Sequence, residues 1–75
     1  MTTVELDTSG LSCPLPVLKA RKALGTVPAG GMLRVLATDP GAVKDFEAFC
    51  AQTGASLERW SEAGGTYTID LRKPA

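Results

Sequence analysis

The sequence predicts an α/β fold of the α+β type, a two-layer sandwich in which two helices cover one face of a four-stranded mixed sheet. Three observations predict it: short segments alternate apolar and polar residues as strands do, two longer segments have helical spacing, and turns rich in Gly and Pro separate them. The resulting order of elements is β-α-β-α-β-β. A chain of 75 residues has room for one small domain, which we expect to span residues 1–75.

The first predicted strand and helix stand on either side of a turn. The segment 4–7 alternates apolar and charged residues, which predicts a strand with Val4 and Leu6 facing inward. The segment 14–24 begins with a proline, which suits the first position of a helix, and Gly25 follows it as a stop. Three apolar residues share one face of this helix and should contact the core: Val17, Ala20 and Leu24.

A second strand and the start of a second helix follow a loop rich in Gly and Pro. The segment 32–37 is largely apolar, which predicts a buried strand. The next three residues, Thr38, Asp39 and Pro40, are typical of a helix start, with one of the first two as the cap and the proline just inside the helix.

The second helix is expected to run to about Gln52 and to end near Gly54. Helical spacing gathers its apolar residues on one face: Val43, Phe46, Phe49 and Cys50. A free cysteine in such company is usually buried, so Cys50 is predicted to belong to the core.

The last part of the chain predicts an antiparallel hairpin. The segments 56–61 and 66–72 are strand-like, and residues 62–65, which include two consecutive glycines, separate them. A sheet of this kind is not the long parallel sheet of a dinucleotide-binding fold, and the sequence contains no GxGxxG motif.

Charge and composition argue against several kinds of site. The 8 Lys and Arg residues balance 8 Asp and Glu residues, so the chain lacks the broad positive field on which nonspecific nucleic-acid binding depends. Histidine, the commonest general base and metal ligand, is missing from the composition. Two cysteines cannot form a four-ligand structural zinc site. We therefore expect neither a metal nor direct contact with nucleic acid.

The sequence also predicts the compartment. Residues 1–10 lack the charged and then apolar pattern of a signal peptide, and no apolar run approaches the roughly 20 residues needed to span a bilayer. We expect a cytoplasmic protein without a membrane partner, in a compartment where thiols are kept reduced. The remaining group with reactivity of its own is a thiol.

Cys13 lies just before the first predicted helix, in the sequence Cys13-Pro14-Leu15-Pro16. The positive end of a helix dipole stabilises a thiolate there, so we expect the pKa of Cys13 to lie below the usual value of about 8.5. Pro16 removes one of the amides that a capping side chain normally binds, which leaves Leu15 and Val17 with the nearest N–H donors. The two prolines also stiffen the junction. Cys13 is therefore predicted to be reactive rather than a structural cap.

A second face of this helix is predicted to meet a partner beside Cys13. It presents an exposed leucine and two lysines, whose charges could strengthen the positive field at the thiol, dock an acidic partner surface, or simply face solvent. Together with the residues after the second strand, the predicted docking set is Leu15, Leu18, Lys19, Lys22, Asp39 and Pro40. The helix-cap role noted above for Asp39 is the simpler one.

The spacing of the cysteines favours a carrier over a dithiol oxidoreductase. Pro16 stands where a C-x-x-C motif has its second sulfur, and a disulfide from Cys13 to Cys50 would need the core cysteine to reach the surface. A single thiolate can still attack the outer sulfur of a donor persulfide and carry that sulfur until a second thiol removes it. Each step is thiol exchange and requires no histidine, metal or bound cofactor.

The motif that contains Cys13 resembles a known family signature. Leu6-Asp7-x-x-Gly10-Leu11-x-Cys13-Pro14-x-Pro16 is similar to the signature of the TusA/SirA/YedF-type sulfur carriers, and Asp39-Pro40 and Phe49-Cys50 also match the family pattern. The resemblance covers nearly the whole chain. It implies a β-α-β-α-β-β sulfurtransferase that carries a persulfide on Cys13, with Gly10, Leu11, Pro14 and Pro16 as supporting residues.

The resemblance also implies partners. Members of the TusA type accept sulfur from a cysteine desulfurase for a relay that thiolates transfer RNA. Others, in sulfur oxidation, take it from rhodanese-like proteins and pass it to DsrE/TusD-type acceptors, and some are linked to molybdenum-cofactor supply. Some members of the transfer-RNA type have an acidic residue between the prolines, where this chain has Leu15. With the segments 37–41 and 43–46 as well, the chain looks closer to the TusA of sulfur-oxidising bacteria.

Two other classes of function remain open from the residues. A non-catalytic adaptor would bind a partner through the same surface, with an incidental thiol. A small α/β RNA-binding domain is the third class, although the zero net charge and the few aromatic residues, two of them predicted in the core, argue against it.

Overall fold

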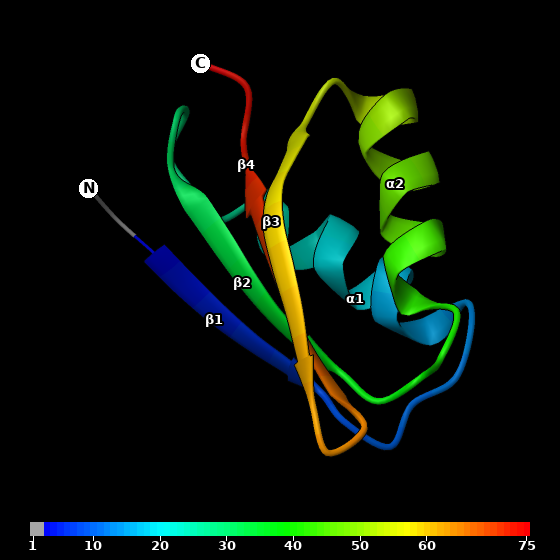
Figure 1. Ribbon diagram of the computed structural model, residues 1–75. Helices are drawn as coiled ribbons and strands as arrows, with labels where there is room; N and C mark the ends of the chain where they lie inside the picture. Colours follow the sequence, from blue (N-terminus) through cyan, green and yellow to red (C-terminus); the bar gives the residue numbers. More distant parts are fainter. Residues whose placement is uncertain (1–2) are drawn as a thin grey trace.

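The computed structural model describes residues 3–75 and has the predicted architecture (Figure 1). Its elements are β1 (Thr3–Thr8), α1 (Leu15–Leu24), β2 (Met32–Ala37), α2 (Ala42–Thr53), β3 (Ser56–Ala63) and β4 (Thr66–Arg72). The strands form one sheet in the order β1-β2-β4-β3, and both helices lie on the same side of it. The predicted two-layer sandwich is confirmed. Residues 1–2 belong to the predicted domain (1–75) and to the N-terminal segment discussed above (1–10), and they lie outside the described residues.

The sheet is mixed because α1 connects the parallel pair β1 and β2, whereas a tight hairpin connects the antiparallel pair β3 and β4. α2 connects β2 to β3, which lie on either side of β4. β1 pairs in parallel with β2 from Thr3↔Met32 to Thr8↔Ala37. β4 pairs antiparallel with both β2 and β3. β3 runs to Ala63, two residues beyond the predicted strand end, because Gly64 and Gly65 close the hairpin alone. Both glycines have positive φ (58° and 88°), as a two-residue hairpin turn requires.

The core lies between the helices and the inner face of the sheet. The predicted inward faces are confirmed: Ala20, Leu24, Phe46, Phe49 and Cys50 are buried, and Val17 and Val43 are half-buried. The largest fully buried side chain is Phe46, whose ring meets that of Phe49 edge to face at a centroid distance of 6.2 Å. Val4 and Leu6 are half-buried because β1 is an edge strand, but they pack against this core as predicted.

Both helices begin later than predicted. α1 begins at Leu15, and Pro14 is its cap rather than its first residue; the carbonyl oxygen of Pro14 accepts the N–H of Leu18 at 3.1 Å. α2 begins at Ala42 after Gly41, with no side-chain cap, so the predicted caps Thr38 and Asp39 are wrong. Their side chains bind another loop instead.

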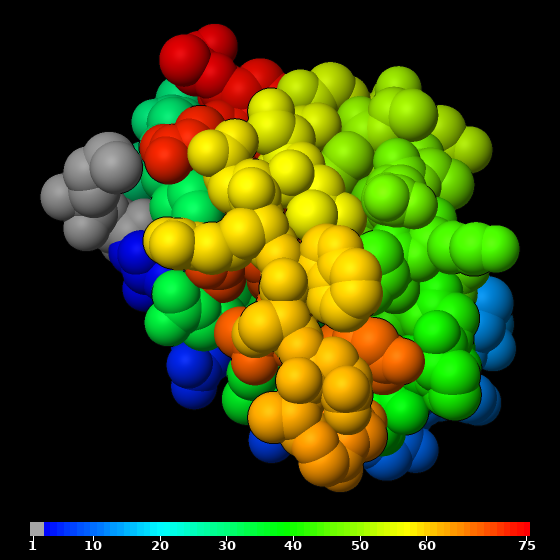
Figure 2. All heavy atoms as spheres, in the orientation of Figure 1, coloured from blue at the N-terminus to red at the C-terminus, as the bar shows by residue number. Residues whose placement is uncertain are grey.

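The predicted end of α2 is confirmed. Gly54 has φ +80°, and its N–H donates to the carbonyl oxygen of Cys50 at 2.9 Å, which closes the helix in a left-handed cap. β3 follows at once and lies next to α2, so that these two elements form most of the surface drawn in Figure 2.

The outer face of the sheet carries a charged cluster that the sequence did not reveal. Asp70 on β4 is buried and accepts hydrogen bonds from Arg34 on β2 (2.8 and 3.1 Å) and Arg59 on β3 (3.1 Å). The cluster joins three strands across the face opposite the helices. In residues 3–75, neither helix is long and apolar enough to cross a membrane.

Candidate functional site

Cys13 lies in the loop between β1 and α1, and side chains from the loop after β2 hold that loop in place. The Gly10 N–H donates to Thr38 Oγ1 at 2.8 Å, and the Cys13 N–H donates to Asp39 Oδ2 at 3.0 Å. Asp39 Oδ1 accepts the N–H of Gly41 at 3.3 Å. Thr38 and Asp39 therefore tie the cysteine loop to the start of α2, which is why they are unavailable as helix caps.

The predicted supporting residues occupy different places in this loop. Gly10 has φ +81°, a conformation that glycine adopts without strain, and its turn is closed by the Leu11 N–H, which donates to the carbonyl oxygen of Thr8 at 3.2 Å. Pro16 is buried in the first turn of α1, whereas Pro14 is exposed next to Cys13.

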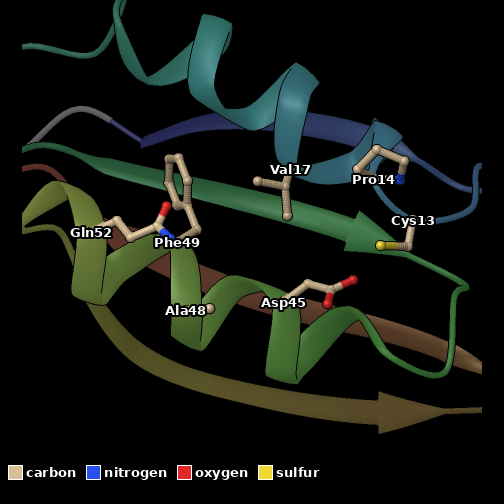
Figure 3. A pocket seen from close by; sticks show the side chains of 7 residues that line it. All are labelled: Cys13, Pro14, Val17, Asp45, Ala48, Phe49 and Gln52. Carbon is tan, nitrogen blue, oxygen red and sulfur yellow. The ribbon is translucent and has the colours of Figure 1, made fainter.

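A shallow hollow of about 190 Å³ opens beside the Cys13 thiol, between the two helices (Figure 3). Its walls come from the start of α1 and one side of α2: Cys13, Pro14, Val17, Asp45, Ala48, Phe49 and Gln52. Figure 3 shows the sulfur of Cys13 and the carboxylate of Asp45 facing one another across this hollow. Cys13 is an exposed free thiol, whereas Cys50 is a buried one.

The charges around the thiol are the reverse of those predicted. The Asp45 carboxylate raises the pKa of Cys13, chiefly by hydrogen bonding to the protonated thiol; slight desolvation and the negative charges of Asp45 and Asp39 raise it further. The expected lowering of the pKa is therefore wrong for the isolated protein.

The start of α1 also differs from the prediction and places Cys13 further from the positive end of the helix dipole. α1 begins at Leu15, so Cys13 lies one residue further from the helix than predicted. The N–H of Leu15, expected to point at the sulfur, donates to the carbonyl oxygen of Ser12 at 2.9 Å.

The predicted docking residues divide into separate surfaces. Leu15 and Leu18 are exposed (44% and 53%), which fits a contact surface on α1. Lys19 and Lys22 line a different hollow of about 290 Å³, together with Leu6, Ala23 and Thr26. The two lysines are thus absent from the lining of the hollow at Cys13, and the alternative in which their charges strengthen a positive field at the thiol stays a prediction. Their role in docking stays a prediction.

Asp39 lies beside the cysteine loop, where it is half-buried and accepts the backbone N–H groups of Cys13 and Gly41. Pro40 is exposed beside it. A docking role for Asp39 and Pro40 stays a prediction. In the part of the chain that the structure describes, no three Cys, Asp or Glu side chains gather into a possible metal site.

Sequence reasoning missed Asp45. A signal for it was present: Asp45, Ala48, Phe49 and Gln52 follow the i, i+3, i+4, i+7 spacing of one helix face. The spacing indicates that these residues share a helix face, but it does not predict that this face lies opposite Cys13. The placement comes from the packing of α1 against α2, which only the fold reveals.

The fold and the site define a small two-layer α+β domain that presents one reactive type of side chain, a thiol, in a surface hollow. The sequence model of the family described as "Sulfurtransferase TusA" matches residues 4–73, so the chain belongs to the TusA sulfurtransferase family. The resemblance of the cysteine-proline signature to this family is confirmed.

Named relatives and a solved structure agree with this membership. The chain is 52% identical to a sulfur carrier protein TusA of Allochromatium vinosum, over 92% of this chain and 91% of that protein. It is 43% identical to a sulfur carrier protein TusA of Pseudomonas entomophila, over 93% of this chain and 88% of that protein. The crystal structure of a SirA-like protein from Desulfitobacterium hafniense shares the fold, with a TM-score of 0.83 at 23% identity over 96% of this chain and 99% of that one. The predicted role of a sulfur carrier, which exchanges sulfur with donor and acceptor proteins, is confirmed at this level.

Proposed function

We propose that the chain is a sulfurtransferase that carries sulfane sulfur as a persulfide on Cys13. The observation that carries the proposal is the contrast between the two thiols. Cys13 is exposed at a hollow that a partner's cysteine can reach, whereas Cys50 lies in the core against Phe46 and Phe49. A persulfide must meet donor and acceptor thiols in turn, and Cys13 has the accessibility for that task.

The transfer is two thiol exchanges. The Cys13 thiol loses its proton, and its sulfur attacks the outer sulfur of a donor Cys–S–SH. The donor S–S bond breaks, and its electron pair stays on the donor sulfur, which takes up a proton. The products are Cys13–S–SH and a donor thiol. An acceptor thiol then attacks the outer sulfur on Cys13 in the same way, which regenerates the Cys13 thiol.

This chemistry defines the cofactor requirement. Sulfur moves between cysteines without a net change in the number of thiols or persulfides, so the steps need no external oxidant or reductant. We therefore propose that the carried sulfur is the chain's one non-protein group and that the protein acts in the cytoplasm, where the thiol stays reduced.

The partners follow from the same proposal. The donor is a cysteine desulfurase or a rhodanese-like protein, and the acceptor is a DsrE/TusD-type protein, in a relay for sulfur oxidation or for transfer-RNA thiolation. The exposed side chains of Leu15 and Leu18, next to the hollow on α1, provide apolar surface for either partner.

Transfer of labelled sulfur tests the proposal. A cysteine desulfurase is incubated with the reduced chain and with cysteine that contains radioactive sulfur. The label bound to the chain is measured before and after treatment with a reductant. Cys13→Ser should carry no label, and the matched variant Cys50→Ala should keep most of it. Label on folded Cys13→Ser, or its loss from folded Cys50→Ala, would contradict a mechanism that uses one thiol.

A further inference from the structure

We propose that Asp45 makes the site selective for the charge of the sulfur donor: it slows small anionic donors and favours donors that are neutral or cationic next to the sulfur they give. This inference rests on the proposed function and deepens it, because it names the class of substrate. Small anionic sulfur compounds, such as thiosulfate or the persulfide anion of a small thiol, would be poor donors. A protein donor with a basic side chain beside its persulfide would be a good one.

The geometry places negative charge on the path to the thiol, and the guanidinium of Arg21 lies over Phe49, another residue of the lining, with its Cζ 5.3 Å from the ring centroid. Asp45 lies on the wall of the hollow and faces the Cys13 sulfur (Figure 3). Asp39 holds the backbone N–H of Cys13 from a second side. The hollow's lining contains no Lys or Arg, and within residues 3–75 neither carboxylate takes part in an ion pair. Asp39 binds two neutral N–H groups, which leave its charge in place.

A reagent must approach the sulfur closely to react, so it comes within a few ångströms of the Asp45 carboxylate. At such separations in water, each unit of charge on the reagent changes the rate by roughly threefold to fivefold at low salt. The effect should therefore be largest for a dianion, absent for a neutral reagent and reversed for a dication.

A charge effect on the approach is separable from an effect on the acidity of the thiol. Any shift in the thiolate fraction changes the rates of all reagents by one factor, because all of them react with the thiolate. The ratio of the rates of two reagents cancels that factor. What remains in the ratio is the interaction of the protein's charges with the charge of the reagent.

The experiment compares three disulfide reagents at Cys13 of the reduced full chain: dianionic dithiobis(nitrobenzoate), neutral dithiodipyridine and dicationic cystamine. Rates are measured at low ionic strength for the wild type, Asp45→Asn and Glu47→Gln, and peptide masses confirm that Cys13 is the residue modified. Glu47 is exposed on α2 and outside the hollow, so its substitution is a control with the same change in net charge.

Asp45→Asn should raise the ratio of the dianion rate to the neutral rate by roughly ninefold to twenty-fivefold, the square of the effect per unit charge, and lower the ratio for the dication. Glu47→Gln should change both ratios by less than about twofold. An unchanged ratio in folded Asp45→Asn, or an equal change in Glu47→Gln, would overturn the proposal.

A measurement on the wild type alone covers the case in which Asp45→Asn fails to fold. Added salt should speed the dianion and slow the dication relative to the neutral reagent, and the absence of both trends would also overturn the proposal. These tests are independent of persulfide loading. Charge selectivity without loading would refute the proposed function alone, and loading without selectivity would refute this inference alone.

Discussion

Two carboxylates act on the Cys13 thiol at the residue scale. Asp39 fixes the cysteine loop through the Cys13 N–H, and Asp45 faces the sulfur from α2. Both charges favour the protonated thiol, so the free protein holds its cysteine in the less nucleophilic form. A donor that brings positive charge to the hollow would relieve this effect at the moment of transfer.

The first prediction concerns the acidity of this thiol. Asp45→Asn removes a negative charge and replaces the carboxylate acceptor of the S–H with a neutral amide oxygen, so the pKa of Cys13 should fall toward its ordinary value. The rate of alkylation by neutral iodoacetamide, measured against pH, should reach half its maximum at a lower pH than in the wild type. Glu47→Gln should leave the midpoint unchanged, and a midpoint for Asp45→Asn equal to or above that of the wild type would refute the assignment.

What could be predicted at this scale was the position of an exposed thiol but not its environment. The order Cys13-Pro14-Leu15-Pro16 pointed to Cys13 because prolines next to a cysteine mark the approach to a helix, although the helix itself begins at Leu15. Asp45 is 32 positions further along the chain, the difference between 45 and 13. Its effect on the thiol depends on how α1 and α2 pack. A single sequence does not give the distance in space between the Asp45 carboxylate and the Cys13 sulfur.

At the scale of elements, α1 separates two exposed surfaces. One side of its start borders the thiol hollow, and Lys19 and Lys22 line the other hollow with Leu6 of β1. A partner that contacts both hollows would also cover the exposed side chains of Leu15 and Leu18. It would meet negative charge at the thiol hollow and positive charge at the lysine hollow.

The second prediction concerns the lysines of this surface. Reversing both charges, Lys19→Glu with Lys22→Glu, should weaken binding of the sulfur donor by roughly threefold to tenfold, mainly through slower association. Both side chains are exposed, so the thermal stability of the chain should change little. Surface plasmon resonance against the donor measures the effect, with Lys44→Glu on α2 as a control. Equal association rates for the wild type and the double variant would remove these lysines from the docking surface.

The third prediction concerns the end of α2. Gly54 has φ +80°, and a Cβ built there would lie 3.8 Å from Pro74, an ordinary contact distance. A larger residue therefore fits sterically at this position, but its backbone is strained by the left-handed conformation. Gly54→Ala should lower the free energy of unfolding by about 1 kcal/mol, and Gly54→Asn by less, because Asn tolerates the left-handed region better. Urea denaturation compares the two variants. An alanine variant as stable as the wild type would mean that the cap contributes nothing.

Element types were predictable because apolar spacing is a local property, and both helices and all strands appear where their periodicity placed them. Element starts were less so. Thr38 and Asp39 have side-chain oxygens of the kind that cap helices. In the fold, Thr38 Oγ1 and Asp39 Oδ2 instead accept hydrogen bonds from backbone N–H groups of the cysteine loop. The hairpin turn was predicted too long because two adjacent glycines suffice to reverse the chain.

At the scale of the whole molecule, a small hydrophobic core is supported by a charged cluster on the opposite face of the sheet. Asp70 receives hydrogen bonds from Arg34 and Arg59, and these interactions hold the pKa of its carboxyl below the usual range, Arg34 having the largest effect. The cluster links β2, β4 and β3 on the side that the helices leave uncovered. It escaped prediction because residues from three strands meet only after the sheet has formed.

The fourth prediction follows from the lowered pKa of Asp70. Because its carboxylate is favoured in the folded state, its contribution to stability is present in full above the unfolded pKa of about 3.9 and is lost as pH falls through the lower folded pKa. Asp70→Asn should cost about 1–3 kcal/mol at neutral pH, and the difference from the wild type should shrink in acid. Urea denaturation at several pH values measures it, with Glu47→Gln as a control. A difference that is constant down to about pH 2 would contradict a role for the charge.

Intact-mass spectrometry can show whether Cys13 carries sulfur. The reduced wild type, Cys13→Ser and Cys50→Ala are exposed to a persulfide-generating donor protein, desalted without reductant and weighed. The wild type and Cys50→Ala should gain the mass of one sulfur atom, which a reductant removes, and Cys13→Ser should gain nothing. An added sulfur on Cys13→Ser, or no gain by the wild type with either a cysteine desulfurase or a rhodanese-like donor, would contradict a carrier role for Cys13.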